Sequence, residues 1–118
     1  MKEMFPYICI YYYNYSDIIS FICYGIEEEG LFFKIKKRND IIDLNKLAYK
    51  AACDSSLGIG IGIISLSVVL NLDKLNIDKP IFCLKECSIY FAKILGINAA
   101  RIAKKVSLKP IKINNLSL

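Results

Sequence analysis

The chain has 118 residues, of which 55% are hydrophobic and 23% charged, and its net charge at pH 7 is +5. This balance excludes an intrinsically disordered chain and predicts a single domain over residues 1–118, with a loose tail after about residue 110. The longest apolar run, residues 58–70, is shorter than the roughly 20 residues that span a bilayer, and the N-terminus lacks the features of a signal peptide, so we expect a cytoplasmic protein with no membrane partner.

The chain begins with a predicted strand, helix and strand. Residues 7–14 are aromatic and β-branched, which is typical of a strand. Ser16 or Asp17 can cap the helix that follows, in which isoleucines recur at helical spacing. Gly30 stands where a left-handed C-cap would end this helix. Residues 31–37 are then the second strand.

The middle of the chain continues this alternation. Asp40 or Asp43 can cap a second helix, in which leucines and alanines share one face up to about residue 54. Residues 57–65 are predicted to form a third strand, with glycines on one face and isoleucines on the other. The glycines do not match the dinucleotide fingerprint Gly-x-Gly-x-x-Gly, because the spacing differs and another strand follows. We expect the glycine face to let a helix or a partner approach the backbone closely.

The last third adds two strands and a helix. Residues 68–72 are the fourth strand and residues 81–85 a short fifth one, whereas residues 87–105 have a helical pattern that Gly96 interrupts. This order predicts an α/β fold: a single Rossmann-like domain with a mostly parallel, four- to five-stranded sheet flanked by helices.

The composition excludes several kinds of chemistry. The chain has no histidine, which rules out Ser–His–Asp and Cys–His catalysis and histidine metal centres. Its five cysteines are widely spaced, and only Cys83 and Cys87 are near each other, so we expect reduced thiols packed as small apolar residues. The basic cluster at residues 34–38 is typical of a solvated strand face and not of a continuous nucleic-acid-binding stripe. We therefore expect no catalytic residue, no cofactor of the chain's own and no nucleic-acid partner.

Three consecutive glutamates, Glu27, Glu28 and Glu29, end the first predicted helix. Because each helical residue turns by about 100°, their side chains point in three directions and do not converge as an acid/base pair. Glu29 falls near the buried face, Glu27 lies well off it, and Glu28 is almost opposite. Three negative charges at a helix C-terminus also oppose the helix dipole, so local stability does not explain them.

The outward face of this helix carries two aromatic residues. Asp17, Phe21, Tyr24 and Glu28 form one stripe, and a helix that faces only water has little need of the two rings. Small ligands in open α/β sheets bind at the opposite edge, where helices begin. We therefore predict a partner interface at Asp17, Phe21, Tyr24, Glu27 and Glu28.

Three sequence blocks, found at residues 24–30 (YGIEEEG), within residues 55–82 (SSLGIGIGI and VVLNLDKLNIDKPIF) and at residues 95–104 (LGINAARIAK), resemble one family. The chain is similar to the small subunit of the glycerol/diol dehydratase reactivating factor, within the wider family of dehydratase medium subunits. Members often have a glycine in the turn between the third and fourth strands, where this chain has residues 64–67 (ISLS).

The resemblance implies an accessory subunit of a chaperone-like factor. Its partner would be a large Hsp70-like ATPase subunit, which hydrolyses ATP, in a complex of two large and two small chains. The factor would release damaged cobalamin from an inactivated dehydratase by subunit swapping. The resemblance also implies that Glu28 reaches a divalent cation, magnesium, held mainly by the large subunit.

Some alternatives stay open from sequence. The chain can also be a short medium subunit of a cobalamin-dependent glycerol/diol dehydratase, although those subunits are usually longer. The client can be a glycerol or a propanediol dehydratase, inside or outside a microcompartment. The chain has more apolar residues than a small core requires, which predicts that the isolated chain self-associates as a homodimer through surfaces meant for its partner.

Overall fold

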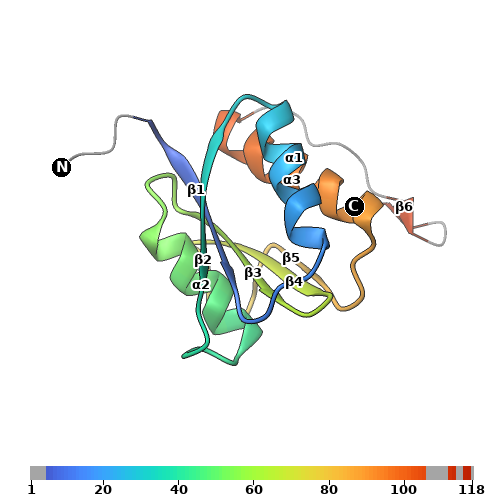
Figure 1. The fold of residues 1–118 in the computed structure, drawn as a ribbon. Coiled ribbons are helices and arrows are strands. Elements are labelled where there is room, and N and C mark those ends of the chain that lie inside the picture. Colours follow the sequence, from blue (N-terminus) through green and yellow to red (C-terminus); the bar gives the residue numbers. More distant parts are fainter. Residues whose placement is uncertain (1–4, 106–111, 114–115, 118) are drawn as a thin grey trace.

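The structure is a computed structural model that describes residues 5–105, 112–113 and 116–117. In this part of the chain, one five-stranded sheet is covered by three helices (Figure 1). The sheet comprises β1 (Tyr7–Tyr12), β2 (Phe32–Lys37), β3 (Ile59–Ile64), β4 (Ser67–Leu72) and β5 (Phe82–Leu84), and the helices are α1 (Ile18–Glu28), α2 (Leu44–Asp54) and α3 (Ile89–Lys104). Two short strands, β6 (Lys112–Ile113) and β7 (Leu116–Ser117), pair antiparallel with each other. Apart from these strands, the predicted loose tail lies outside the described residues.

The sheet is mixed. Its strand order is β2-β1-β3-β4-β5, and β1 pairs parallel with β2 and β3, whereas the pairs β3–β4 and β4–β5 are antiparallel. The α/β class and the number of strands are confirmed, but a mostly parallel, Rossmann-like sheet is not. The cause is local, because only Ser65 and Leu66 separate β3 from β4, and so short a turn reverses the chain. Ser65 has a φ of 54° in this turn, a conformation that glycine adopts more easily.

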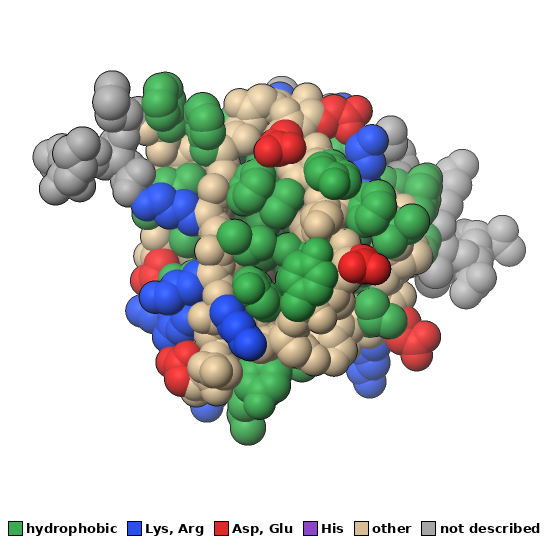
Figure 2. Space-filling model, in the orientation of Figure 1, with side chains coloured by type: hydrophobic (Ala, Val, Ile, Leu, Met, Phe, Trp, Pro, Cys, Tyr) green, Lys and Arg blue, Asp and Glu red, His purple; other side chains and the backbone are tan. Residues whose placement is uncertain are grey.

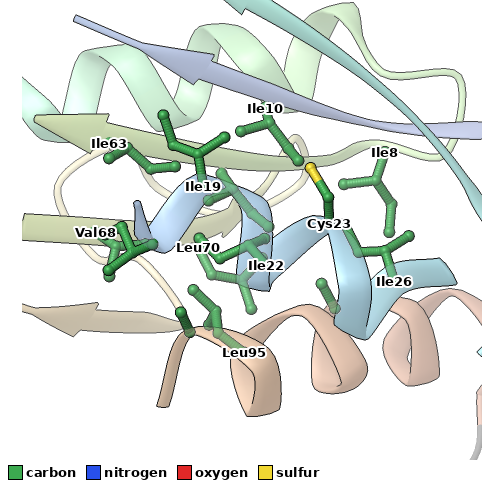
Figure 3. Packing of buried hydrophobic residues seen from close by; sticks show 14 of the residues in the cluster. Ile8, Ile10, Ile19, Ile22, Cys23, Ile26, Ile63, Val68, Leu70 and Leu95 are labelled. Atoms are coloured by element: carbon green, nitrogen blue, oxygen red, sulfur yellow. The ribbon is translucent and has the colours of Figure 1, made fainter. Parts of the chain in front are cut away.

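The helices lie on both faces of the sheet and create two cores. Side chains alternate along β1, so that Ile8 and Ile10 face α1 and α3 while Cys9 and Tyr11 face α2. Figure 3 shows the larger core, in which sheet residues meet Ile22 of α1. The labelled side chains there are Ile8, Ile10, Ile19, Ile22, Cys23, Ile26, Ile63, Val68, Leu70 and Leu95.

The glycines of β3 let α2 lie directly on the sheet. A Cβ atom on Gly60 would be 2.0 Å from the backbone nitrogen of Ala52, and one on Gly62 would be 2.6 Å from that of Ala48. No side chain fits at such distances. The predicted close approach to the glycine face is confirmed, and α2 is the helix that approaches.

A second close contact joins α1 to α3. A Cβ atom on Gly25 would be 2.2 Å from the carbonyl oxygen of Lys93, and one on Gly96 would be 2.0 Å from that of Ile22. The expectation that Gly96 interrupts the last helix is wrong, since α3 continues unbroken from Ile89 to Lys104. At Gly96 the backbone of α3 packs directly against the backbone of α1.

The ends of the helices follow the predicted signals, with one exception. Asp43 caps α2 by accepting hydrogen bonds from the backbone N–H groups of Asn45 and Lys46. Gly30 follows α1 with a φ of 78°, as a left-handed C-cap position requires. Asp17 occupies the N-cap of α1, but its side chain makes no capping hydrogen bond. None of the described helices is long and apolar enough to cross a membrane.

Candidate partner-binding site

Glu29 connects the end of α1 to the last turns of α3. Its Oε2 atom lies 3.2 Å from a guanidinium nitrogen of Arg101, and its Oε1 atom lies 2.9 Å from Nζ of Lys104. Hydrogen bonds from Lys104 and then Arg101 lower the pKa of Glu29 below its ordinary value. The predicted position near the buried face is confirmed, and the two cations offset a negative charge that the helix dipole disfavours.

Glu28 points away from the core, as predicted, but it also meets α3. Its Oε1 atom lies 3.3 Å from Nζ of Lys93, and both side chains are about half exposed, 52% for Glu28 and 48% for Lys93. Sequence reasoning missed this ion pair, because helical spacing places Glu28 on its own helix but does not give the register between two helices. The carboxylate is thus accessible to solvent and weakly paired.

The other predicted interface residues differ in their exposure and in their distance along α1 from Glu28. Phe21 and Tyr24 pack edge to face, with ring centroids 5.4 Å apart and an interplanar angle of 78°. Phe21 is half-buried beside the larger core, whereas Tyr24 is 52% exposed. The stripe therefore does not lie entirely in solvent, since α3 covers part of it. Asp17 and Glu27 are exposed, and Asp17 lies at the opposite end of α1 from Glu28.

A groove lies between α1 and α3. It has a volume of about 450 Å³ and is lined by Phe21, Glu28, Ile89, Tyr90, Lys93, Ile94 and Ile97. We call it the α1–α3 groove. Two of its apolar side chains are well exposed, Ile89 at 52% and Tyr90 at 62%. Figure 2 shows hydrophobic side chains gathered over α1 and the adjoining part of α3, with single charged side chains among them.

Glu28 can supply one ligand to a divalent cation. Carboxylate oxygen suits magnesium, which proteins often hold through only one or two carboxylates. No three acidic or cysteine side chains come together as a metal centre within the described ranges. Glu28 offers a single carboxylate there, and its side chain is half exposed.

The cysteines are all free. Cys9, Cys23 and Cys87 are buried, and burial is the main cause that raises the pKa of each thiol to about 11. Cys53 and Cys83 are exposed. The prediction that the cysteines pack as small apolar residues is thus confirmed for the three buried ones.

The basic cluster covers the edge strand β2. The ammonium of Lys34 lies 4.3 Å from the ring centroid of Tyr7, and the guanidinium of Arg38 lies 5.0 Å from that of Tyr11. Arg38 also pairs with Asp40 at 2.9 Å. Residues 34–37 are exposed, which confirms the predicted solvated face for them, whereas the side chain of Arg38 is only 16% exposed. Lysines on an edge strand also discourage pairing with another sheet.

These features define an α/β domain with a partly apolar groove between two helices, lined in part by the Glu28–Lys93 ion pair. The model of the dehydratase medium subunit family matches residues 5–109. The chain belongs to this family.

Individual relatives agree with this assignment. The propanediol dehydratase-reactivating factor small subunit of Citrobacter freundii is 32% identical over 95 residues, which are 80% of this chain and 81% of the relative. A solved structure of diol dehydratase-reactivating factor complexed with ADP and Mg2+ matches with a TM-score of 0.80 and 26% identity, over 88% of this chain and 97% of that chain. A glycerol dehydratase reactivase structure matches with a TM-score of 0.82 and 26% identity, over 88% and 96%. The resemblance seen in the sequence is confirmed as homology to the small subunit of the reactivating factor.

Proposed function

We propose that the chain is the small, non-catalytic subunit of a chaperone-like reactivating factor for a glycerol or diol dehydratase. Together with a large Hsp70-like ATPase subunit, it takes part in releasing damaged cobalamin from the inactivated enzyme by subunit swapping, in the cytoplasm. The observation that carries this proposal is the identity of 32% over 81% of a relative named as the small subunit of such a factor.

The chain's own residues have a binding role in this proposal. Glu28 ends α1 as an accessible carboxylate, and it would contribute one oxygen to a magnesium ion held mainly by the large subunit. The ion would link the two subunits electrostatically. Phe21 and Tyr24 supply apolar contact area beside it. ATP hydrolysis belongs to the large subunit.

Co-expression with the large subunit of the same factor tests this proposal. The two chains are expected to elute together in gel filtration and to stay together at low micromolar concentration. A chain that always elutes alone contradicts the proposal.

A comparison of neighbouring glutamates tests the role of Glu28. We expect Glu28→Gln to weaken binding to the large subunit in the presence of magnesium, because it removes an anionic ligand at constant size. Glu27→Gln is the matched control, since Glu27 is exposed one residue away and outside the α1–α3 groove. Calorimetric titration with and without magnesium measures both effects, and equal losses for the two variants contradict the metal-bridging role.

The family itself supplies the second candidate, a short medium subunit of a cobalamin-dependent glycerol/diol dehydratase, because the matching family model describes medium subunits. The 97% coverage of the reactivating-factor chain favours the first candidate. Cobalamin titration followed by visible absorbance, with catalytic or ATPase partner subunits present, separates the two.

A further inference from the structure

The ion pair between Glu28 and Lys93, two lining residues of the α1–α3 groove, restricts which partner can cover this groove. Lys93 pairs with Glu28 at 3.3 Å in this structure. If Glu28 turns to a divalent cation, the ammonium of Lys93 loses this counter-ion and lies close to added positive charge. A partner that covers the groove also removes water from Lys93, and an unpaired charge in an interface is costly. The partner therefore has to supply a new anion.

The apolar walls of the groove also restrict which partner can bind there. Ile89 and Tyr90 stand more than half exposed on α3, opposite Phe21 on α1. Such an apolar hollow gains most from a side chain that fills it and excludes water. The net charge of +5 also favours an acidic partner surface over a second basic chain.

We infer that the α1–α3 groove is the docking site of the large subunit, which inserts an apolar side chain beside Tyr90 and places a carboxylate against Lys93. The inference rests on the proposed function and extends the interface from α1 to α3. It makes Lys93 a residue that selects the partner by charge.

Charge reversal with a matched control tests the role of Lys93. Lys50 is the control, because it is 47% exposed and pairs with Asp54 at 3.2 Å, but lies on α2 across the sheet. We expect Lys93→Glu to weaken binding to the large subunit by about tenfold or more, and Lys50→Glu to change it by less than about twofold. Lys93→Gln is expected to weaken binding as well, since it leaves the partner's carboxylate unpaired. Circular dichroism and the thermal midpoint check that each variant is folded.

A second pair of variants tests the apolar wall. Tyr90→Ser should weaken binding by about tenfold, whereas Tyr15→Ser should not, although Tyr15 is equally exposed at 61%. An acid-to-lysine change in the large subunit that restores binding of Lys93→Glu would identify the carboxylate.

The outcomes separate the two proposals. If the wild-type chains form a complex and neither Lys93→Glu nor Tyr90→Ser weakens it, this inference is overturned while the proposed function stands. Tighter binding by Lys93→Gln also overturns it, because Lys93 would then only compete for Glu28. If these variants abolish self-association and leave the complex intact, the groove binds a second copy instead. If the wild-type chains form no complex at all, both proposals fail.

Discussion

Adjacent carboxylates at the end of α1 have different surroundings because α3 passes beside only one side of the helix. Glu29 is 14% exposed and lies between Arg101 and Lys104, whereas Glu28 is 52% exposed and has a single weak partner in Lys93. Glu29 therefore holds α1 against α3. Glu28 remains accessible to a second chain.

The ion pairs of Glu29 with Arg101 and Lys104 should make the free energy of unfolding depend on pH. The pKa of Glu29 is lowered in the folded chain, so folding favours its ionised form. This contribution is present above the ordinary pKa of 4.5 and is lost as the pH falls through the folded value. We expect Glu29→Gln to have a lower urea midpoint than the wild type at pH 7, and the difference to vanish on acidification below 4.5. Glu27→Gln is the control, and a difference that persists in acid would contradict an ionic anchor.

The sequence predicts the direction of each glutamate but not its ionic partner. Direction follows from the fixed turn per residue of a helix, so the directions of Glu28 and Glu29 relative to the buried isoleucines are predicted correctly. Lys93 and Arg101 lie far along the chain, and no spacing rule relates them to α1. The groove was missed for the same reason, since one of its walls belongs to another helix.

At the scale of elements, the contact between α1 and α3 depends on Gly25 and Gly96. Because these residues have no side chain, the backbones of the two helices can touch. We expect Gly96→Ala to destabilise the fold by about 1–3 kcal/mol, because the added methyl overlaps the Ile22 carbonyl and forces the helices apart. It should also weaken binding to the large subunit, since α3 carries one wall of the groove. Urea unfolding and calorimetric titration measure the two effects.

Gly30→Ala is the control for this prediction. A Cβ atom on Gly30 meets nothing within 4 Å, so the variant experiences only the strain of its positive φ, a cost of about 1–2 kcal/mol, and should bind the large subunit normally. The double variant of Gly25→Ala and Gly96→Ala should lose less stability than the sum of the single losses, because both methyls separate the same helices. Strict additivity would argue against a shared contact.

Local patterns predict the elements better than their arrangement. The strand at residues 57–65 and the helix cap at Asp43 follow from alternation and capping chemistry, which neighbouring residues determine. Strand direction at β4 depends on a tight turn that lacks the usual glycine. Gly96 was misread as an interruption because glycine lowers helix propensity. The structure shows instead that the missing side chain lets α3 pack closely against α1.

At the scale of the whole molecule, the reaction rates of the buried cysteines measure how often the whole domain unfolds. Cys9 lies on the α2 face of the sheet, Cys23 on α1, and Cys87 just before α3. Their thiols have pKa values raised to about 11, so little reactive thiolate is present at neutral pH. We expect a disulfide reagent to modify Cys53 and Cys83 rapidly and the three buried thiols slowly, at one common rate.

Mass spectrometry of the labelled chain measures these rates. Fully denatured protein is the control, in which all five cysteines should react quickly. If one buried thiol reacts together with the exposed pair, part of the molecule opens independently and the chain is not a single cooperative unit.

The bond between Glu29 and Arg101 joins residues that are 72 positions apart. The α1–α3 groove likewise takes one wall from α1 and the other from α3, the last helix in the described part of the chain. Because synthesis proceeds from the N-terminus, a nascent chain on the ribosome can display Phe21 and Glu28 before Tyr90 and Lys93 have been made. A subunit that recognises both walls can bind the complete groove only after α3 has been synthesised and has packed against α1.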